Sequence, residues 1–94
     1  MLEIRRSHRF KKDFKNVMRQ PYFDKKLFEY VVGELAAQRP LVEKFCDHAL
    51  TGKQDGLNGC RECHIKPDWL LVYKVIEGEL ILYLFETGTH SDLY

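Results

Sequence analysis

Apolar residues recur every three or four positions near the start of the chain. The first series consists of Phe10, Phe14, Val17 and Met18. This spacing predicts an amphipathic helix whose outer face carries Lys and Arg. Ser7 is a residue type preferred at the N-cap of a helix, and Pro21 breaks the pattern.

A second helical series follows directly. Its apolar stripe consists of Leu27, Phe28, Val31, Val32 and Leu35. Asp24 precedes this stripe as a candidate N-cap, and Pro40 marks its end. Two helices joined by a short turn that contains a proline predict an αα-hairpin.

Four segments have the alternation or the β-branched and aromatic content of strands: residues 2–6, 60–65, 69–76 and 80–85. Gly52, Gly56 and Gly59 mark a loop before the second of them. The predicted order is β-α-α-β-β-β. We expect one α+β domain over residues 1–94, with both helices packed on one face of an antiparallel sheet of about four strands.

Alternation within residues 60–65 assigns their side chains to two faces. Cys60, Glu62 and His64 share one face, and the residues between them share the other. The run Cys60 to His64 matches the C-x-x-C-H pattern of haem attachment, so a haem or metal protein is one hypothesis. Opposite faces for Cys60 and Cys63 argue against it, and a closed zinc site needs four ligands. We therefore expect no metal and no cofactor, and a buried Cys63.

Charge is distributed unevenly over the 94 residues, although the net charge is only +1. Residues 1–26 hold nine Lys or Arg against three acidic residues, and the remainder holds six against eleven. The basic segment indicates either a face that meets phosphate or a solvated helix face, and charge alone leaves both open. No apolar run approaches the length of roughly 20 residues that a membrane span needs. The N-terminus also lacks the apolar core of a signal peptide, so we expect a cytoplasmic protein with reduced cysteines.

Residue types that transfer protons near neutral pH concentrate after residue 46. They are His48, Glu62, His64, Asp68, His90 and Asp92. A lone histidine is usually a surface group, and we assign His8 to that class. The other three histidines lie near predicted strand ends together with Asp68, which favours catalysis and leaves scattered surface groups as the alternative.

Three motifs carry a family resemblance: DHALTG from residue 47, GCRECHIKPDWLLVYKV from residue 59, and LYLFETGTHSDLY from residue 82. They resemble the YafQ branch of the RelE superfamily. The resemblance implies a RelE-like fold and a type II toxin–antitoxin toxin that cuts mRNA in the ribosomal A site without a metal. It also implies inhibition by a cognate antitoxin, often in a heterotetramer, with DNA contacted only through the antitoxin.

The resemblance also assigns roles to residues of this chain. His48, His64, Asp68 and His90 correspond to the acid–base group, with His90 as general acid and His48 or His64 as base. Trp69 and Tyr94 correspond to supporting or base-stacking positions. The basic helix would then present Arg9, Lys11, Lys12 and Lys15 to ribosomal RNA.

Glu86 departs from the family pattern, which often has arginine at this position to stabilise the transition state. A carboxylate there repels a phosphorane unless it is neutralised or turned away. The substrate-binding cation would come instead from Arg61, Lys53 or Lys66. Alternatively, Glu86 faces a positive group of the ribosome or antitoxin, or the protein is a weak or inactive relative that serves as an antitoxin-binding module and co-repressor.

Overall fold

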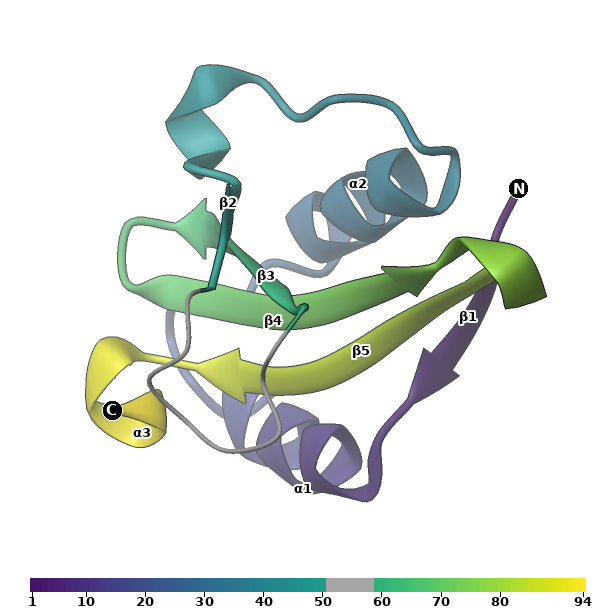
Figure 1. The fold of residues 1–94 in the computed structure, drawn as a ribbon. Coiled ribbons are helices and arrows are strands. Elements are labelled where there is room, and N and C mark those ends of the chain that lie inside the picture. The colour runs from purple at the N-terminus through teal and green to yellow at the C-terminus, as the bar shows by residue number, and fades with distance from the viewer. Residues whose placement is uncertain (51–58) are drawn as a thin grey trace.

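The computed structural model describes residues 1–50 and 59–94, in which a five-stranded sheet packs against two helices (Figure 1). The helices are α1 (His8–Val17), α2 (Lys25–Ala36) and the short α3 (His90–Leu93). The strands are β1 (Glu3–Arg6), β2 (His48–Ala49), β3 (Arg61–Lys66), β4 (Trp69–Ile76) and β5 (Ile81–Gly88). Short 3₁₀ turns cover Glu43–Phe45 and Glu77–Glu79. Among these described residues, no helix is long and apolar enough to cross a membrane. The predicted loop residues Gly52, Lys53 and Gly56 lie outside the described part.

Strand pairing differs from the predicted all-antiparallel sheet, while the α+β class is confirmed. The strand order is β1-β5-β4-β3-β2, and β1 pairs in parallel with β5, with Glu3 opposite Ile81. The chain between β1 and β5 contains both helices and the other three strands, so it is long enough for the crossover that parallel pairing needs. The strand β2 holds only two residues, too few to leave an alternating pattern in the sequence.

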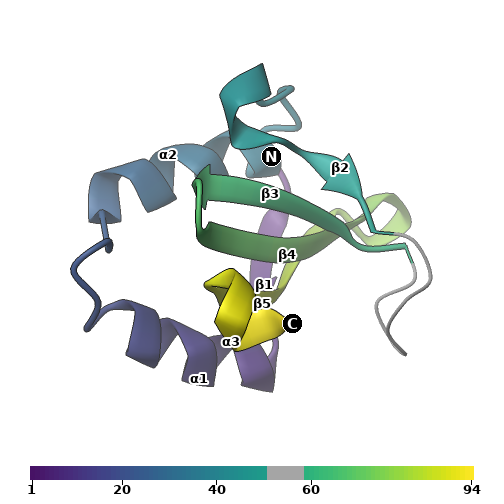
Figure 2. The same ribbon diagram turned by 90° about the vertical axis from the view of Figure 1, so that its left-hand side faces the viewer.

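Both predicted helix caps are present. The Ser7 hydroxyl oxygen accepts from the Phe10 amide at 2.8 Å, and Asp24 accepts from the Leu27 amide at 3.1 Å. Figure 2 shows α1 and α2 as the two arms of the hairpin. The Ser7 hydroxyl also donates to the carbonyl oxygen of Phe85 at 2.7 Å. The strand β1 ends opposite Leu84, and beyond this point α1 packs along the edge of β5.

Apolar side chains fill both faces of the sheet. The helix-side core includes Phe10, Val17, Val31, Cys63, Trp69, Leu71 and Tyr73. A smaller cluster on the opposite face, called here the open face, includes Cys60, Leu70, Val72 and Leu93. The predicted burial of Cys63 is confirmed, and this burial raises the pKa of its thiol to about 12.

Candidate active site

Three imidazoles meet on the open face although they come from distant parts of the chain. The ring centroids of His48 and His64 are 6.1 Å apart, and those of His64 and His90 are 5.6 Å apart. They lie on β2, β3 and α3, three elements near one end of the sheet (Figure 1). The spatial convergence expected for the histidines is therefore present in the structure.

Asp68 holds the imidazole of His90. Its Oδ1 lies 2.5 Å from Nδ1 of His90 and accepts from the His90 amide at 2.9 Å. The backbone and side-chain hydrogen bonds from His90 lower the pKa of Asp68. A carboxylate acceptor at Nδ1 orients the ring and leaves Nε2 directed away from Asp68, free to exchange a proton with a substrate.

Gly88 allows the chain to turn from β5 into α3. Its φ is +154°, and a Cβ at this position would lie 2.9 Å from both Cβ and Oδ2 of Asp92. Asp92 forms a capping box with Thr89 at the start of α3. The turn therefore depends on a residue without a side chain, and His90 follows as the first residue of the helix.

Glu62 lies between the other two imidazoles and is only 5% exposed. Its Oε1 is 3.4 Å from Nε2 of His48 and 4.0 Å from Nε2 of His64. In both rings Nδ1 faces a carbonyl oxygen, of Cys46 at 2.6 Å and of Pro67 at 3.2 Å. Since a carbonyl oxygen only accepts, each Nδ1 carries its proton and each Nε2 faces the carboxylate.

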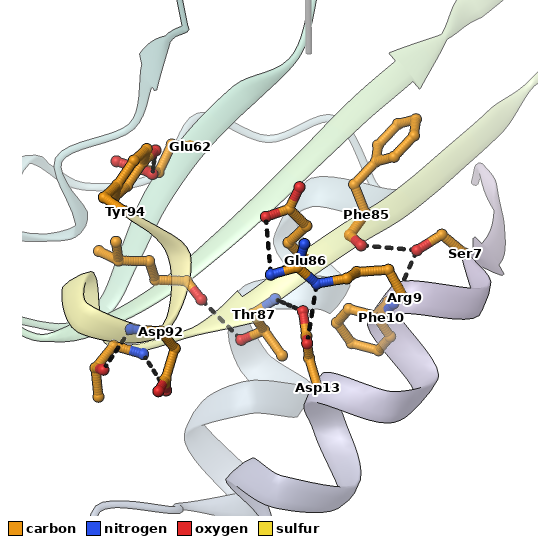
Figure 3. A network of polar contacts seen from close by, with 12 residues as sticks. Ser7, Arg9, Phe10, Asp13, Glu62, Phe85, Glu86, Thr87, Asp92 and Tyr94 are labelled. Carbon is orange, nitrogen blue, oxygen red and sulfur yellow. Dashed lines mark hydrogen bonds and ion pairs between the residues drawn. The ribbon is translucent and has the colours of Figure 1, made fainter. Parts of the chain in front are cut away.

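The Tyr94 hydroxyl donates to the second oxygen of Glu62, Oε2 (Figure 3). Burial and this hydrogen bond raise the pKa of Tyr94. The residue as a whole is still 58% exposed, so its ring offers a surface on which a base can stack. Substrate binding by Tyr94 stays a prediction, with an exposed ring available for it.

Glu86 projects from β5 onto the open face and contacts α1. It stands opposite Val72, and Val72 in turn stands opposite Glu62, so the two carboxylates lie in one row across the sheet. Oε1 of Glu86 is 3.8 Å from an Nη atom of Arg9 (Figure 3). Burial raises the pKa of the Glu86 carboxyl, and the charge of Arg9 opposes the rise.

The residues predicted to supply the substrate-binding cation do not lie beside the histidines in the described part of the chain. Arg61 points to the helix side, where its Nε and Nη2 each lie 3.3 Å from Asp47. Lys66 donates to the carbonyl oxygen of Tyr22 at 2.7 Å. The alternation of β3 places Arg61 on the face opposite His64, so the prediction that Arg61 binds substrate beside the histidines is wrong for this structure. Lys53 lies outside the described residues.

Trp69 is also a correction, because it is fully buried. Its indole Nε1 donates to the Thr87 hydroxyl at 2.9 Å, and its ring packs against Tyr22, Phe23 and Phe28. A ring enclosed in this way has no free surface for a nucleotide base. Its hydrogen bond to Thr87 anchors β4 to β5, which fits the supporting position, the other alternative given for Trp69. Base stacking stays a prediction for Tyr94.

The four basic residues of α1 predicted to bind RNA lie on more than one face of the helix. All four residues are exposed, and Arg9 is the one that meets Glu86 at the site. Lys11 and Lys15 line a groove with Phe14 and Met18 on another face of α1. Contact with ribosomal RNA stays a prediction for all four residues, Arg9 included.

Metal-ligand chemistry is present within the cluster itself. One ligand atom each of His48, Glu62 and His64 lies within 4.8 Å of the others, a spacing from which three ligands can close on one ion. Cys60 and Cys63 are buried on opposite faces, which is incompatible with joint attachment of one haem.

Glu62 is the central residue of the cluster, and the sequence analysis listed it among the proton-transferring types but gave it no role in the site. The sequence does contain a signal, because Glu62 precedes His64 by two positions in a strand and so shares its face. The sequence does not show that Glu62 is buried between two histidines, because His48 comes from another strand.

The chain is similar to known proteins over nearly its whole length. The family model described as "Bacterial toxin of type II toxin-antitoxin system, YafQ" matches residues 2–94. The mRNA interferase toxin YafQ of Escherichia coli strain B / BL21-DE3 is 32% identical over 93 residues, which cover 98% of this chain and 95% of that protein.

Two solved structures show the same fold. A metal-bound toxin from Helicobacter pylori is 47% identical, with a TM-score of 0.89 and coverage of 100% of both chains. An E. coli DinJ-YafQ complex contains a chain that is 30% identical, with a TM-score of 0.82 and coverage of 100% of this chain and 99% of that one.

These matches place the chain among the bacterial toxins of type II toxin–antitoxin systems. Within this class, it belongs to the YafQ family. The resemblance read from the three sequence motifs is thereby confirmed, as is the RelE-like α+β fold.

Proposed function

We propose that the chain is the toxin of a type II toxin–antitoxin pair and cleaves mRNA by metal-independent acid–base catalysis on the ribosome. The observation that carries this proposal is the convergence of His48, His64 and His90 with Asp68 on one face. The name mRNA interferase borne by its E. coli relative supports the reaction class. The DinJ-YafQ complex supports a cognate antitoxin as the partner, and action on ribosomes implies the cytoplasm.

The reaction needs three events: the 2′-oxygen loses its proton, attacks phosphorus, and the departing 5′-oxygen gains a proton. His90 supplies the proton from Nε2, because Asp68 occupies its Nδ1 and stabilises the imidazolium. Cleavage of the P–O5′ bond then leaves a 2′,3′-cyclic phosphate and a free 5′-hydroxyl.

The general base is a coupled unit. His48 and His64 both direct Nε2 at Glu62, so the proton taken from the 2′-hydroxyl is shared between a carboxylate and an imidazole. One of these two histidines acts as the base together with Glu62. The other, as an imidazolium beside Glu62, stabilises the negative charge that develops on the phosphoryl oxygens. This arrangement combines the two alternatives that the sequence left open for the base.

The decisive experiment compares the parent chain with His90→Ala. Both are induced in bacteria without antitoxin, and 5′ ends of cellular mRNA are mapped. We expect growth arrest and new cleavage sites for the parent only, with His8→Ala as the matched control that behaves like the parent. Equal cleavage by His90→Ala and the parent would refute the assignment of His90.

Ribosome dependence and metal independence are tested in vitro. Purified protein is mixed with mRNA with and without ribosomes, and each mixture is repeated with a chelator selective for transition metals, which leaves the Mg²⁺ of the ribosome in place. We expect cleavage that requires ribosomes and persists in chelator. Raised salt should weaken the ribosome docking assigned to Arg9, Lys11, Lys12 and Lys15, since phosphate contacts release counterions.

Glu86 favours a second candidate, a catalytically weak or inactive relative that acts as an antitoxin-binding module and co-repressor. A half-buried carboxylate in the row of Glu62 opposes phosphate binding. Under this alternative, the parent is harmless on induction, and its effect appears only as stronger promoter repression together with the antitoxin.

A further inference from the structure

Arg9 brings a positive charge from α1 to the edge of the candidate active site. Its Nε lies 3.3 Å from Oδ1 of Asp13, one helical turn along. The other oxygen of Asp13 accepts from the Thr87 amide at 3.2 Å, as Figure 3 shows. Arg9 is thereby tied to the end of β5, three residues before His90.

Among residues 1–50 and 59–94, the guanidinium of Arg9 leaves several of its hydrogen-bond donors without a partner. Arginine has five N–H donors in a planar fork, and Arg9 directs only Nε at Asp13. The distance of 3.8 Å between Nη2 and Glu86 exceeds that of an N–H···O hydrogen bond. The side chain is 55% exposed, so the remaining donors are accessible to a ligand with paired oxygens.

The surrounding charges explain why a cation is needed here. Glu62 and Glu86 project from the same face of the sheet, and Asp68 lies beside His90. Three carboxylates repel a polyanion. Arg61 and Lys66 are engaged on the helix side, as described above. Lys74 is on the open face, but its ammonium lies beside Gly59, and the cation that acts on Glu86 is Arg9.

We propose that Arg9 binds a backbone phosphate of the RNA substrate beside the histidine cluster, with Asp13 and Glu86 as the residues that position its guanidinium. The inference rests on the proposed function, because it assigns a substrate contact of the same site. It also gives Glu86 a role, because the carboxylate that stands where the family often has arginine holds an arginine that comes from α1. Arginine suits this contact because its fork matches two phosphate oxygens.

The test measures binding to an RNA that carries 2′-O-methyl groups throughout and so cannot be cleaved by its own 2′-oxygen. Dissociation constants are determined over a range of salt concentrations, with and without ribosomes. Arg9→Gln should weaken binding roughly 10- to 100-fold at low salt and reduce the slope of log K against log[salt] by about 0.7. Arg39→Gln is the matched control, since Arg39 is also exposed and paired with a carboxylate, Glu34, on α2.

A charge exchange sharpens the test. Arg9→Glu should bind more weakly than Arg9→Gln, and adding Glu86→Arg to it should recover most of the lost binding because a cation returns to the same pair. Far-ultraviolet circular dichroism and thermal melting confirm that each variant is folded. The inference is overturned if Arg9→Gln and Arg39→Gln share one affinity and one salt slope, or if the folded double variant stays as weak as Arg9→Glu.

Failure of this inference differs from failure of the proposed function. A parent chain that leaves RNA uncut refutes the nuclease proposal. A parent that cuts RNA, beside an Arg9→Gln variant that binds and cuts equally well, refutes the role of Arg9 alone.

Discussion

Asp68 and His90 are 22 positions apart in the sequence, yet one carboxylate oxygen of Asp68 meets both the backbone amide and the imidazole Nδ1 of His90. The first contact fixes the start of α3, and the second fixes the ring. A single side chain in the β3–β4 turn therefore sets both the position of the imidazole and which of its nitrogens points away from the carboxylate.

Replacement of Asp68 by asparagine should slow cleavage while leaving substrate affinity unchanged. The asparagine side chain has an oxygen that can still accept from the His90 amide, but it brings no charge to stabilise the imidazolium. We expect the single-turnover rate to fall roughly 10- to 100-fold. Rapid-quench cleavage assays measure the rate, and a fall in affinity for uncleavable RNA without a fall in rate would contradict this account.

Gly88→Ala should disrupt the site through the backbone. The added Cβ meets Asp92 at 2.9 Å, and the φ of +154° is strained for alanine. We expect a loss of about 1–3 kcal/mol in the free energy of unfolding and a larger loss of cleavage, because α3 carries His90. Gly78→Ala is the control, since nothing lies within 4 Å of a Cβ placed there. Urea titration and cleavage assays on both variants decide the matter.

Glu86→Gln should change how stability depends on pH. Burial raises the folded-state pKa of Glu86 above its ordinary value, so the protonated carboxyl favours the folded state. Its contribution is present below about pH 4.5 and is lost as pH rises through the folded-state pKa. The variant should therefore match the parent at pH 4 and exceed its free energy of unfolding at pH 7. Urea unfolding at several pH values tests this, and identical pH profiles would contradict it.

Tyr94 should act through its ring and its hydroxyl separately. Tyr94→Phe keeps the stacking surface and removes the hydrogen bond to Glu62, whereas Tyr94→Ala removes both. Because a base–aromatic stack is worth about 1–3 kcal/mol, Tyr94→Ala should raise the KM for RNA by roughly 5- to 150-fold. Tyr94→Phe should leave KM near the parent value and alter the pH–rate profile. An equal KM for the two variants would exclude stacking.

A transition-metal ion should inhibit cleavage. His48, Glu62 and His64 present three ligand atoms within 4.8 Å of one another. Copper held there would occupy the nitrogens that catalysis needs. We expect inhibition by added Cu²⁺, reversal by chelator, and weaker inhibition of the residual activity of His48→Ala. His8→Ala serves as the control. Calorimetry should show that the parent and His8→Ala bind Cu²⁺ more tightly than His48→Ala does.

Much of the fold was predictable because it depends on near neighbours. Helix caps at Ser7 and Asp24 act within three residues, and the alternation that separates Glu62 from Cys63 acts within two. The parallel pairing of β1 with β5 was not predictable in this way. It joins segments separated by nearly the whole chain, and local periodicity carries no information on strand direction.

The candidate site was likewise predictable only in part. Motifs in the sequence identified His48, His64, Asp68 and His90, and their convergence is what the structure shows. They also nominated Arg61 as a substrate contact, which the pleat of β3 turns to the helix side.

Sequence alone determined the residue types available for catalysis, the helices and the face of each β3 side chain, because these follow from chemistry and short-range geometry. Tertiary structure alone decided that Glu62 is buried between two imidazoles, that Trp69 is enclosed, and that Glu86 meets Arg9. Those contacts join residues brought together only when helices and sheet bury their apolar faces against one another. Their energies depend on burial and distance, which the order of residues does not contain.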